Sequence, residues 1–184
     1  MDGVLFKKHK NWGNDCECWR LQCITPSGSE HPYCDKIQLI MLISFFGVWG
    51  ADSFIFNYST SQGEFIPLPL RLFPGLLSAS IGIYLGVKSH KAVFSDAHDQ
   101  PRLIDSGVYS RVRHPMYLGT LLFCLGFFLS SFSLLSLVIW AGFFVFYDKM
   151  TAYEEKDLVR LLGKQYITYQ NKVPKWIPNI RTKD

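Results

Sequence analysis

The chain has 184 residues, a mass of 21.2 kDa and a formal net charge of +4; 48% of its residues are hydrophobic and only 18% are charged. This composition excludes a disordered or fibrous chain. The charge is also unevenly distributed, because no ionised side chain occurs between His114 and Asp148. That stretch is longer than the roughly 20 apolar residues that a membrane-spanning helix needs. The composition therefore predicts an all-α, polytopic membrane protein.

The apolar segments predict about four transmembrane helices, since a helix satisfies every backbone group inside the bilayer. The first two run from about Ile37 to Phe56 and from about Leu68 to Val87. The third block, Met116 to Val145, is too long for one ordinary span and has serines near its middle. We expect it to form a short hairpin of two helices of about 15 residues each, which tilt or thin the bilayer locally.

Cationic residues predict the orientation of these spans. Lys and Arg gather in the N-terminal segment, in the loop after the second span and after the fourth span, whereas residues 57–67 contain neither. By the positive-inside rule, both termini are expected in the cytoplasm. The first 36 residues are polar, so no cleavable signal peptide is expected. The expected location is the endoplasmic reticulum in a eukaryote or the plasma membrane in a prokaryote.

Two charged residues lie within the predicted spans. Asp52 is near the outer end of the first span and Arg71 is near the outer start of the second. Unpaired charges in a bilayer are costly, and an antiparallel hairpin would bring these two to a similar depth. We expect them to pair with each other or to extend to the membrane surface, in a structural role.

A polar motif lies where the loop after residue 88 enters the third span. It contains Arg113, His114, Pro115 and Tyr117. Proline suits the first turn of a helix, and the free amides of that turn together with nearby cations form a natural site for anions. The alternative is a basic collar at the membrane surface with interfacial tyrosines.

A second motif follows the fourth span. Glu154 and Glu155 begin an amphipathic pattern that reaches Tyr169 and ends in the segment Val173 to Pro178. This pattern predicts one amphipathic helix along the inner membrane surface. Neighbouring helical residues point roughly 100° apart, so one glutamate can face inward while the other stays in solvent. The alternative for the pair is a favourable interaction with a helix N-terminus.

The elements RHPMYLG, the Glu-Glu pair and LLGKQYITYQNKVPKWIP together resemble the catalytic half of the integral-membrane methyltransferases. This is the family of isoprenylcysteine carboxyl methyltransferase and phospholipid methyltransferase, and the resemblance extends over about residues 82–178. It implies an enzyme that transfers a methyl group from S-adenosylmethionine to a hydrophobic or membrane-embedded acceptor, such as an isoprenylcysteine carboxylate or a lipid amine. No strand followed by GxGxxG occurs, so a Rossmann domain has no support.

The resemblance also implies roles for residues of both motifs. The implied residues are, for catalysis, Arg113, His114 and Tyr117 and, for cofactor binding, His114, Pro115, Tyr117, Gly119, Glu154 and Glu155. Glutamates and aromatic faces suit the ammonium and sulfonium groups of the cofactor, and a cation suits its carboxylate. Gly82 and Gly86 lie four residues apart, a spacing that we interpret as helix packing.

We divide the chain into a cytoplasmic segment (1–36), a transmembrane hairpin (37–88) and a methyltransferase core (89–184). The first segment contains most of the cysteines, which are Cys16, Cys18, Cys23 and Cys34. Four thiols can form a tetrahedral zinc site, but CxxC pairs are absent, so unpaired thiols in a tail are the favoured interpretation. No metal is expected in the core.

Two other functions stay open. Membrane sterol reductases share an Arg-His-Pro-x-Tyr element and bind NADPH, but Asn usually follows the proline where this chain has Met116. A non-enzymatic scaffold could use its basic collar to bind anionic lipids. The expected partners are the lipid bilayer and a lipidic or prenylated acceptor, and no nucleic acid is expected. The identity of the acceptor and the oligomeric state are left open.

Overall fold

The computed structural model describes residues 34–60, 66–95 and 103–178. In these ranges the chain is helical and contains no strand, which confirms the all-α prediction. The α-helices are α1 (Cys34–Gly50), α2 (Leu68–Ser95), α3 (Pro115–Ser131), α4 (Leu134–Leu162) and α5 (Lys164–Lys172). A π-helix, η2 (Ala51–Phe56), extends α1, and a 3-10 helix, η4 (Gly107–Ser110), precedes α3.

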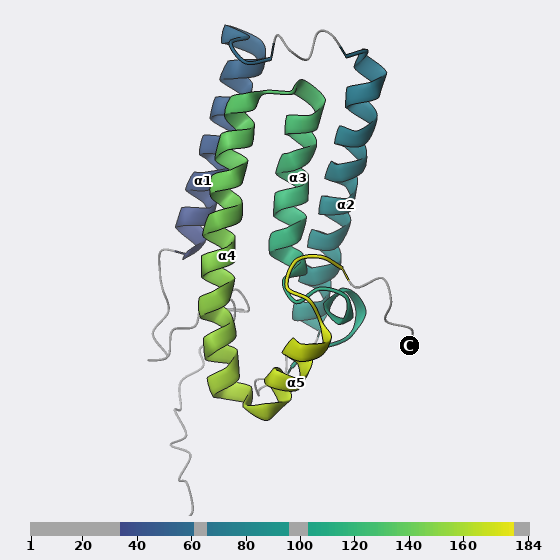
Figure 1. Ribbon diagram of the computed structural model, residues 1–184, viewed down its shortest axis with the longest axis vertical. Coiled ribbons are helices and arrows are strands. Elements are labelled where there is room, and N and C mark those ends of the chain that lie inside the picture. Colours follow the sequence, from purple (N-terminus) through teal and green to yellow (C-terminus); the bar gives the residue numbers. More distant parts are fainter. Residues whose placement is uncertain (1–33, 61–65, 96–102, 179–184) are drawn as a thin grey trace, which may run out of the picture.

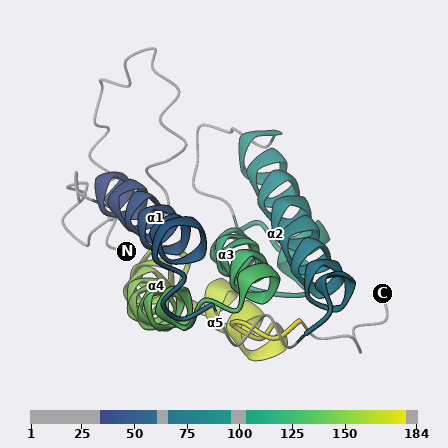
Figure 2. The same ribbon diagram turned by 90° about the horizontal axis from the view of Figure 1, so that it is seen from above.

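The four longer helices run side by side, and α5 lies across one end of the bundle (Figure 1). Seen from above, α3 is central, with α2 on one side and α1 and α4 on the other (Figure 2). The largest buried side chains, which include Phe45, Tyr117 and Tyr147, lie where α1, α3 and α4 meet. Three segments are long and apolar enough to cross a membrane, namely Gln38–Phe56, Leu68–Ala92 and Leu134–Leu162. Helix α3 is apolar but has only 17 residues.

The long apolar block divides near its serines, as predicted, but its second half is not short. Phe132 adopts a left-handed conformation with φ +54°, and the hydroxyl of Ser133 accepts a hydrogen bond from the amide of Ser136 at 3.2 Å. This cap starts α4, which then continues for 29 residues. Residues 146–162 contain neither Gly nor Pro, so no local signal ends the helix as it leaves the apolar block.

A separate helix follows the fourth span, as predicted, but the predicted start of that helix is wrong. Glu154 and Glu155 belong to the last third of α4, and the amphipathic pattern is divided at Gly163. Gly163 has φ +55°, a conformation that is cheap only for glycine. The turn at this residue reverses the chain and brings α5 back toward the start of α3 (Figure 1).

Glycines allow α2 and α3 to pack with their backbones close together. A Cβ on Gly82 would lie 2.5 Å from the carbonyl oxygen of Gly119, and one on Gly126 would lie 2.6 Å from that of Gly75. The packing role of Gly82 is confirmed, whereas a Cβ on Gly86 would meet nothing within 4 Å. A Cβ on Gly119 would likewise meet the α2 backbone, so this glycine also allows a neighbouring helix to come close, and its role in cofactor binding stays a prediction.

The predicted pairing of Asp52 with Arg71 is wrong. Helices α1 and α2 lie on opposite sides of α3 (Figure 2), and in the described part of the chain no ion pair joins the two residues. Asp52 instead accepts hydrogen bonds from the amide of Ser59 at 3.0 Å, from the hydroxyl of Ser59, and from the hydroxyl of Ser133 at 2.5 Å. Its role is structural, since it ties the end of η2 to the turn between α3 and α4.

Candidate active site at the start of α3

The two sequence motifs meet at the end of the bundle that α5 covers. His114 precedes α3, and Pro115 occupies the first turn of that helix. Proline is tolerated there because the amide that it lacks would have no partner within the helix. Glu154 and Glu155 reach the same place from α4. These side chains lie in the interior, with His114 7% and Glu155 9% exposed.

The Glu155 carboxylate is held from three directions. Its Oε1 lies 3.0 Å from Nε2 of His114 and 3.3 Å from Nη1 of Arg113. Its Oε2 accepts a hydrogen bond from Nε2 of Gln170, on α5, at 2.9 Å. A buried carboxylate is tolerated only when it is paired and hydrogen-bonded, so these contacts also fix its orientation.

The Glu154 carboxylate approaches the other side of the same histidine. The hydroxyl of Tyr117 donates to its Oε1 at 2.5 Å, and its Oε2 lies 3.8 Å from Nδ1 of His114. The expectation that one glutamate faces inward and the other faces solvent is wrong, since only 11% and 12% of the two side chains are exposed. Glu154 is covered by α3, through Tyr117, and Glu155 is covered by α5, through Gln170.

His114 lies between the two glutamates with one ring nitrogen toward each. Burial lowers its pKa below the ordinary value, although the hydrogen bond and the charge of Glu155 oppose this shift. The ring is therefore neutral at neutral pH. The closer contact is the one at Nε2, so we assign the ring proton to that nitrogen.

Three tyrosines, one in η4 and two in α5, support this cluster. The hydroxyl of Tyr169 donates to the carbonyl oxygen of Tyr109 at 2.7 Å, which ties α5 to η4. Burial raises the pKa of Tyr109 to about 12, and it also raises the pKa values of Tyr166 and Tyr169. All three therefore stay protonated at physiological pH and act as neutral hydrogen-bonding groups.

After α5 the chain returns across the site as a segment without helix, residues 173–178, which we call the C-terminal strap (Figure 1). The backbone amide of Arg113 donates to the carbonyl oxygen of Pro174 at 3.0 Å. The ring of Trp176 lies 6.3 Å from that of His114, measured between centroids. The strap therefore forms one wall of the site.

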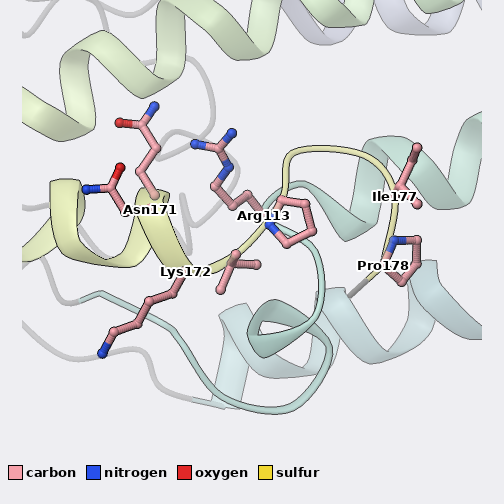
Figure 3. A pocket seen from close by; sticks show the side chains of 8 residues that line it. Arg113, Asn171, Lys172, Ile177 and Pro178 are labelled. Carbon is pink, nitrogen blue, oxygen red and sulfur yellow. The ribbon is translucent and has the colours of Figure 1, made fainter. Parts of the chain in front are cut away.

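An open hollow of about 560 Å³ adjoins the polar cluster. Its walls come from the residue before His114, from the end of α5 and from the strap, and its lining residues are Arg113, Gln170, Asn171, Lys172, Val173, Pro174, Ile177 and Pro178. Figure 3 shows the Arg113 side chain between α5 and the strap. Nε of Arg113 is buried and has no hydrogen-bond partner among the described residues, so this cation has unused donor capacity beside the hollow.

Asp148 is a residue of this region that the sequence motifs did not reveal. It interrupts the apolar block, which was the only signal at that position. Tyr109 and Gln170 lie within the motif segments, but the sequence assigned neither of them a role. Gln170 reaches Glu155 because the chain reverses at Gly163, and Asp148 meets the site through the strap that follows.

The candidate zinc ligands fall mostly outside the described residues. Cys16, Cys18 and Cys23 fall outside the described residues, and Cys34 is described only as the first backbone position of α1, so the zinc hypothesis stays a prediction. Over the part of the chain that the structure describes, no group of His, Cys, Asp and Glu could hold a metal ion. Cys124 is a buried free thiol within the helical core.

Comparison with known proteins agrees with this architecture. The sequence profile of the phospholipid methyltransferase family matches residues 68–165. The protein-S-isoprenylcysteine O-methyltransferase of Schizosaccharomyces pombe is 32% identical over 133 residues, which are 70% of this chain and 55% of that protein. The proteins of the same name from Xenopus laevis and Saccharomyces cerevisiae are 30% and 42% identical, over 63% and 42% of this chain and 41% and 33% of their own lengths.

A helical bundle with apolar spans and a polar site at one end is the architecture of an integral membrane protein. The chain belongs to the phospholipid methyltransferase family, as its matched residues show and as its motifs indicated. It spans about half, or less, of the length of the curated relatives named above. The orientation in the membrane and the division into regions stay predictions.

Proposed function

We propose that this protein transfers a methyl group from S-adenosylmethionine to the carboxylate of an isoprenylcysteine. The observation that carries the proposal is the buried arrangement of Glu154 and Glu155 around His114, next to an incompletely paired Arg113 and an open hollow. The names of the relatives support the choice of acceptor, which stays a proposal because the chain covers only part of their length.

The donor set of the site fits this cofactor. When bound, S-adenosylmethionine supplies an activated methyl group on a positively charged sulfur. The carboxylates of Glu154 and Glu155 and the ring of Tyr117 can stabilise its cationic groups. The unpartnered Nε of Arg113 can receive its carboxylate. The hollow of about 560 Å³ lies within the volume range of sites for small molecules and can accept the nucleoside part.

The residues of the site would act by orientation and exclusion of water. A carboxylate acceptor is already ionised at neutral pH, so the reaction needs no general base. His114 and Tyr117 each hold one glutamate in a fixed direction, and Arg113 supplies a fixed positive charge. Fixed charges in a site from which water is excluded stabilise a reacting pair more strongly than they would in water. We therefore assign His114 a role in orientation and none in proton transfer.

An apolar acceptor is favoured by a row of aromatic rings that leads to the site. Trp140 and Phe144 lie on α4 with their centroids 6.1 Å apart, and Phe144 lies 5.6 Å from Trp176 of the strap. Trp176 in turn faces His114. The row joins the apolar surface of the bundle to the polar cluster, which suits an acceptor with a hydrocarbon chain and a charged end.

Calorimetric binding of S-adenosylhomocysteine to the full chain in detergent tests the cofactor assignment. We expect binding by the wild type and a loss of at least about a hundredfold in Glu154→Gln/Glu155→Gln, because cation binding requires the carboxylates. Asp157→Asn is the matched control, since Asp157 lies on the same helix and pairs with Arg160 rather than with the residues around His114. Binding of NADPH in place of the homocysteine product would identify a reductase. Binding of neither would favour the scaffold.

A transfer assay with radiolabelled methyl donor then tests the acceptor. We compare a farnesylated cysteine derivative with phosphatidylethanolamine, each in the same detergent. Methylation of the prenylated carboxylate is the expected result. Transfer to the lipid amine alone would contradict the proposed acceptor and leave the cofactor assignment intact.

A further inference from the structure

One carboxylate outside the glutamate pair holds the C-terminal strap against α4. Oδ1 of Asp148 accepts hydrogen bonds from Nζ of Lys175 at 2.5 Å and from Nε1 of Trp176 at 2.9 Å. The same ammonium of Lys175 also donates to the backbone carbonyl oxygen of Asp148 at 2.9 Å. Two successive side chains of the strap therefore share one carboxylate oxygen.

The strap also forms part of the site itself. Its residues Val173, Pro174, Ile177 and Pro178 line the hollow beside Arg113. Apart from the bond to the amide of Arg113, the described backbone of the strap is tied into the fold only at its start, where the amide of Val173 donates to α5. Its position on the α4 side therefore depends on side chains, and Asp148 binds two of them.

The cluster of His114, Tyr117 and the two glutamates is closed on the side that the strap covers. His114 and Tyr117 are 7% and 2% exposed, so a ligand the size of a nucleoside cannot reach them without movement of a wall. Helices α3 and α4 are long and packed against each other, whereas the strap is a segment of six residues without helix. Segments with few backbone hydrogen bonds open at the lowest cost in free energy.

The contact to Asp148 has a strength that suits a reversible closure. The side chain of Asp148 is 48% exposed and that of Lys175 is 20% exposed, so solvent screens the ion pair. The bond from the Trp176 indole is charge-assisted, and its ring packs against the core. Together they hold the strap in place but remain breakable on the time scale of turnover.

We propose that Asp148 is a positioning residue, which holds the strap as a wall of the cofactor site and thereby limits how fast the cofactor product leaves. This inference rests on the proposed function, because it assumes that the cofactor lies beneath the strap. It assigns Asp148 no contact with the substrate or the reacting atoms. Its effect passes through Lys175 and Trp176.

The test is the dissociation rate of S-adenosylhomocysteine from the full chain, measured by displacement with excess unlabelled ligand. In Asp148→Ala we expect dissociation to be faster by on the order of fivefold to tenfold, since the carboxylate bonds to both strap side chains are lost and only the bond from Lys175 to the backbone carbonyl remains. Asp148→Glu retains the charge and should restore part of the slow dissociation. Asp157→Asn, which removes a carboxylate from the same helix outside the site, should dissociate like the wild type.

Two further variants separate positioning from a general loss of structure. Lys175→Met and Trp176→Phe each remove one of the two donors, and each should give a smaller increase in rate than Asp148→Ala. Under saturating cofactor, kcat of Lys175→Met should be unchanged or higher, while its KM for the cofactor rises. A merely structural role would instead lower kcat with no change in the dissociation rate of the folded fraction.

The outcomes distinguish this inference from the function on which it rests. If the wild type binds the product, and Asp148→Ala and Lys175→Met both release it at the wild-type rate, the proposed role of Asp148 is overturned. The methyltransferase proposal then stays in place. Absence of product binding in the wild type would overturn the proposed function first. If Asp148→Ala does not fold, Lys175→Met alone decides the question.

Discussion

Both ends of the bundle contain buried carboxyl groups, but the partners of these groups differ between the two ends. At the turn between α3 and α4, Asp52 is bound by Ser59 and Ser133, whose neutral donors satisfy it within the protein. At the other end, two carboxylates lie around one neutral histidine, beside a guanidinium that retains an unpartnered nitrogen. At the turn end, every donor is paired with the carboxylate, so the contacts contribute to stability. At the other end, an incompletely paired polar group lies next to a hollow, where it can bind a ligand.

Removal of both carboxyl groups at the site end should have the largest effect on binding. Glu154→Gln/Glu155→Gln is expected to weaken product binding by at least about a hundredfold, which corresponds to about 2.7 kcal/mol. Thermal stability should fall moderately, because Arg113 loses its charge partner while the amide oxygens can still accept hydrogen bonds from Tyr117 and His114. Calorimetry and thermal unfolding in detergent measure the two quantities. A large loss of stability with retained product binding would mean that the two glutamates serve stability and not ligand binding.

The opposite pattern is expected at the turn end. Asp52→Ala leaves the hydroxyl of Ser133 and the groups of Ser59 without their acceptor, which should cost about 1–3 kcal/mol of folding free energy. Product binding per folded molecule should stay unchanged, since the site lies at the far end of the bundle. Asp52→Asn is the control, because its amide oxygen retains one acceptor. Weakened binding in folded Asp52→Ala would show that the two ends are coupled.

A smaller effect is expected for the hydroxyl of Tyr117. Tyr117→Phe keeps the ring and its contact with Tyr147 but removes the bond to Glu154. We expect product binding to weaken about fivefold, because a hydrogen bond contributes about 1 kcal/mol. The matched control is Tyr153→Phe, an exposed tyrosine on α4. Equal affinities of the two variants would remove Tyr117 from the set of orienting residues.

The parts of this structure that the sequence predicted are those with local causes. Apolar stretches marked the spans because the thickness of the bilayer sets their length, and the serines marked the turn before Ser133. The length of α4 was missed because a helix does not end where its composition becomes polar. The pairing of Asp52 was missed because neighbours in a bundle are not always neighbours along the chain: α3 separates α1 from α2.

The same distinction holds within the site. His114, Tyr117 and the two glutamates belong to contiguous motifs, and their resemblance to a family indicated that they act together. Gln170 reaches Glu155 because the positive φ at Gly163 reverses the chain. The pattern of polar and apolar residues does not predict the direction of that reversal.

The pH dependence of stability provides the finest test of the site end. Because burial lowers the pKa of His114, the unfolded chain binds more protons than the folded one between the folded pKa and the ordinary value of about 6.5. The stabilising contribution of the neutral ring is therefore complete above about pH 6.5 and is lost as the pH falls toward the folded pKa. The wild type should lose more thermal stability between neutral and mildly acidic pH than His114→Gln, which does not titrate. Parallel curves for the two proteins would mean that the pKa of His114 is not lowered in the folded state. A smaller loss in the wild type than in His114→Gln would mean that the folded state holds a proton on the ring beside Glu155, so that the site would present a cation where we have assigned a neutral donor.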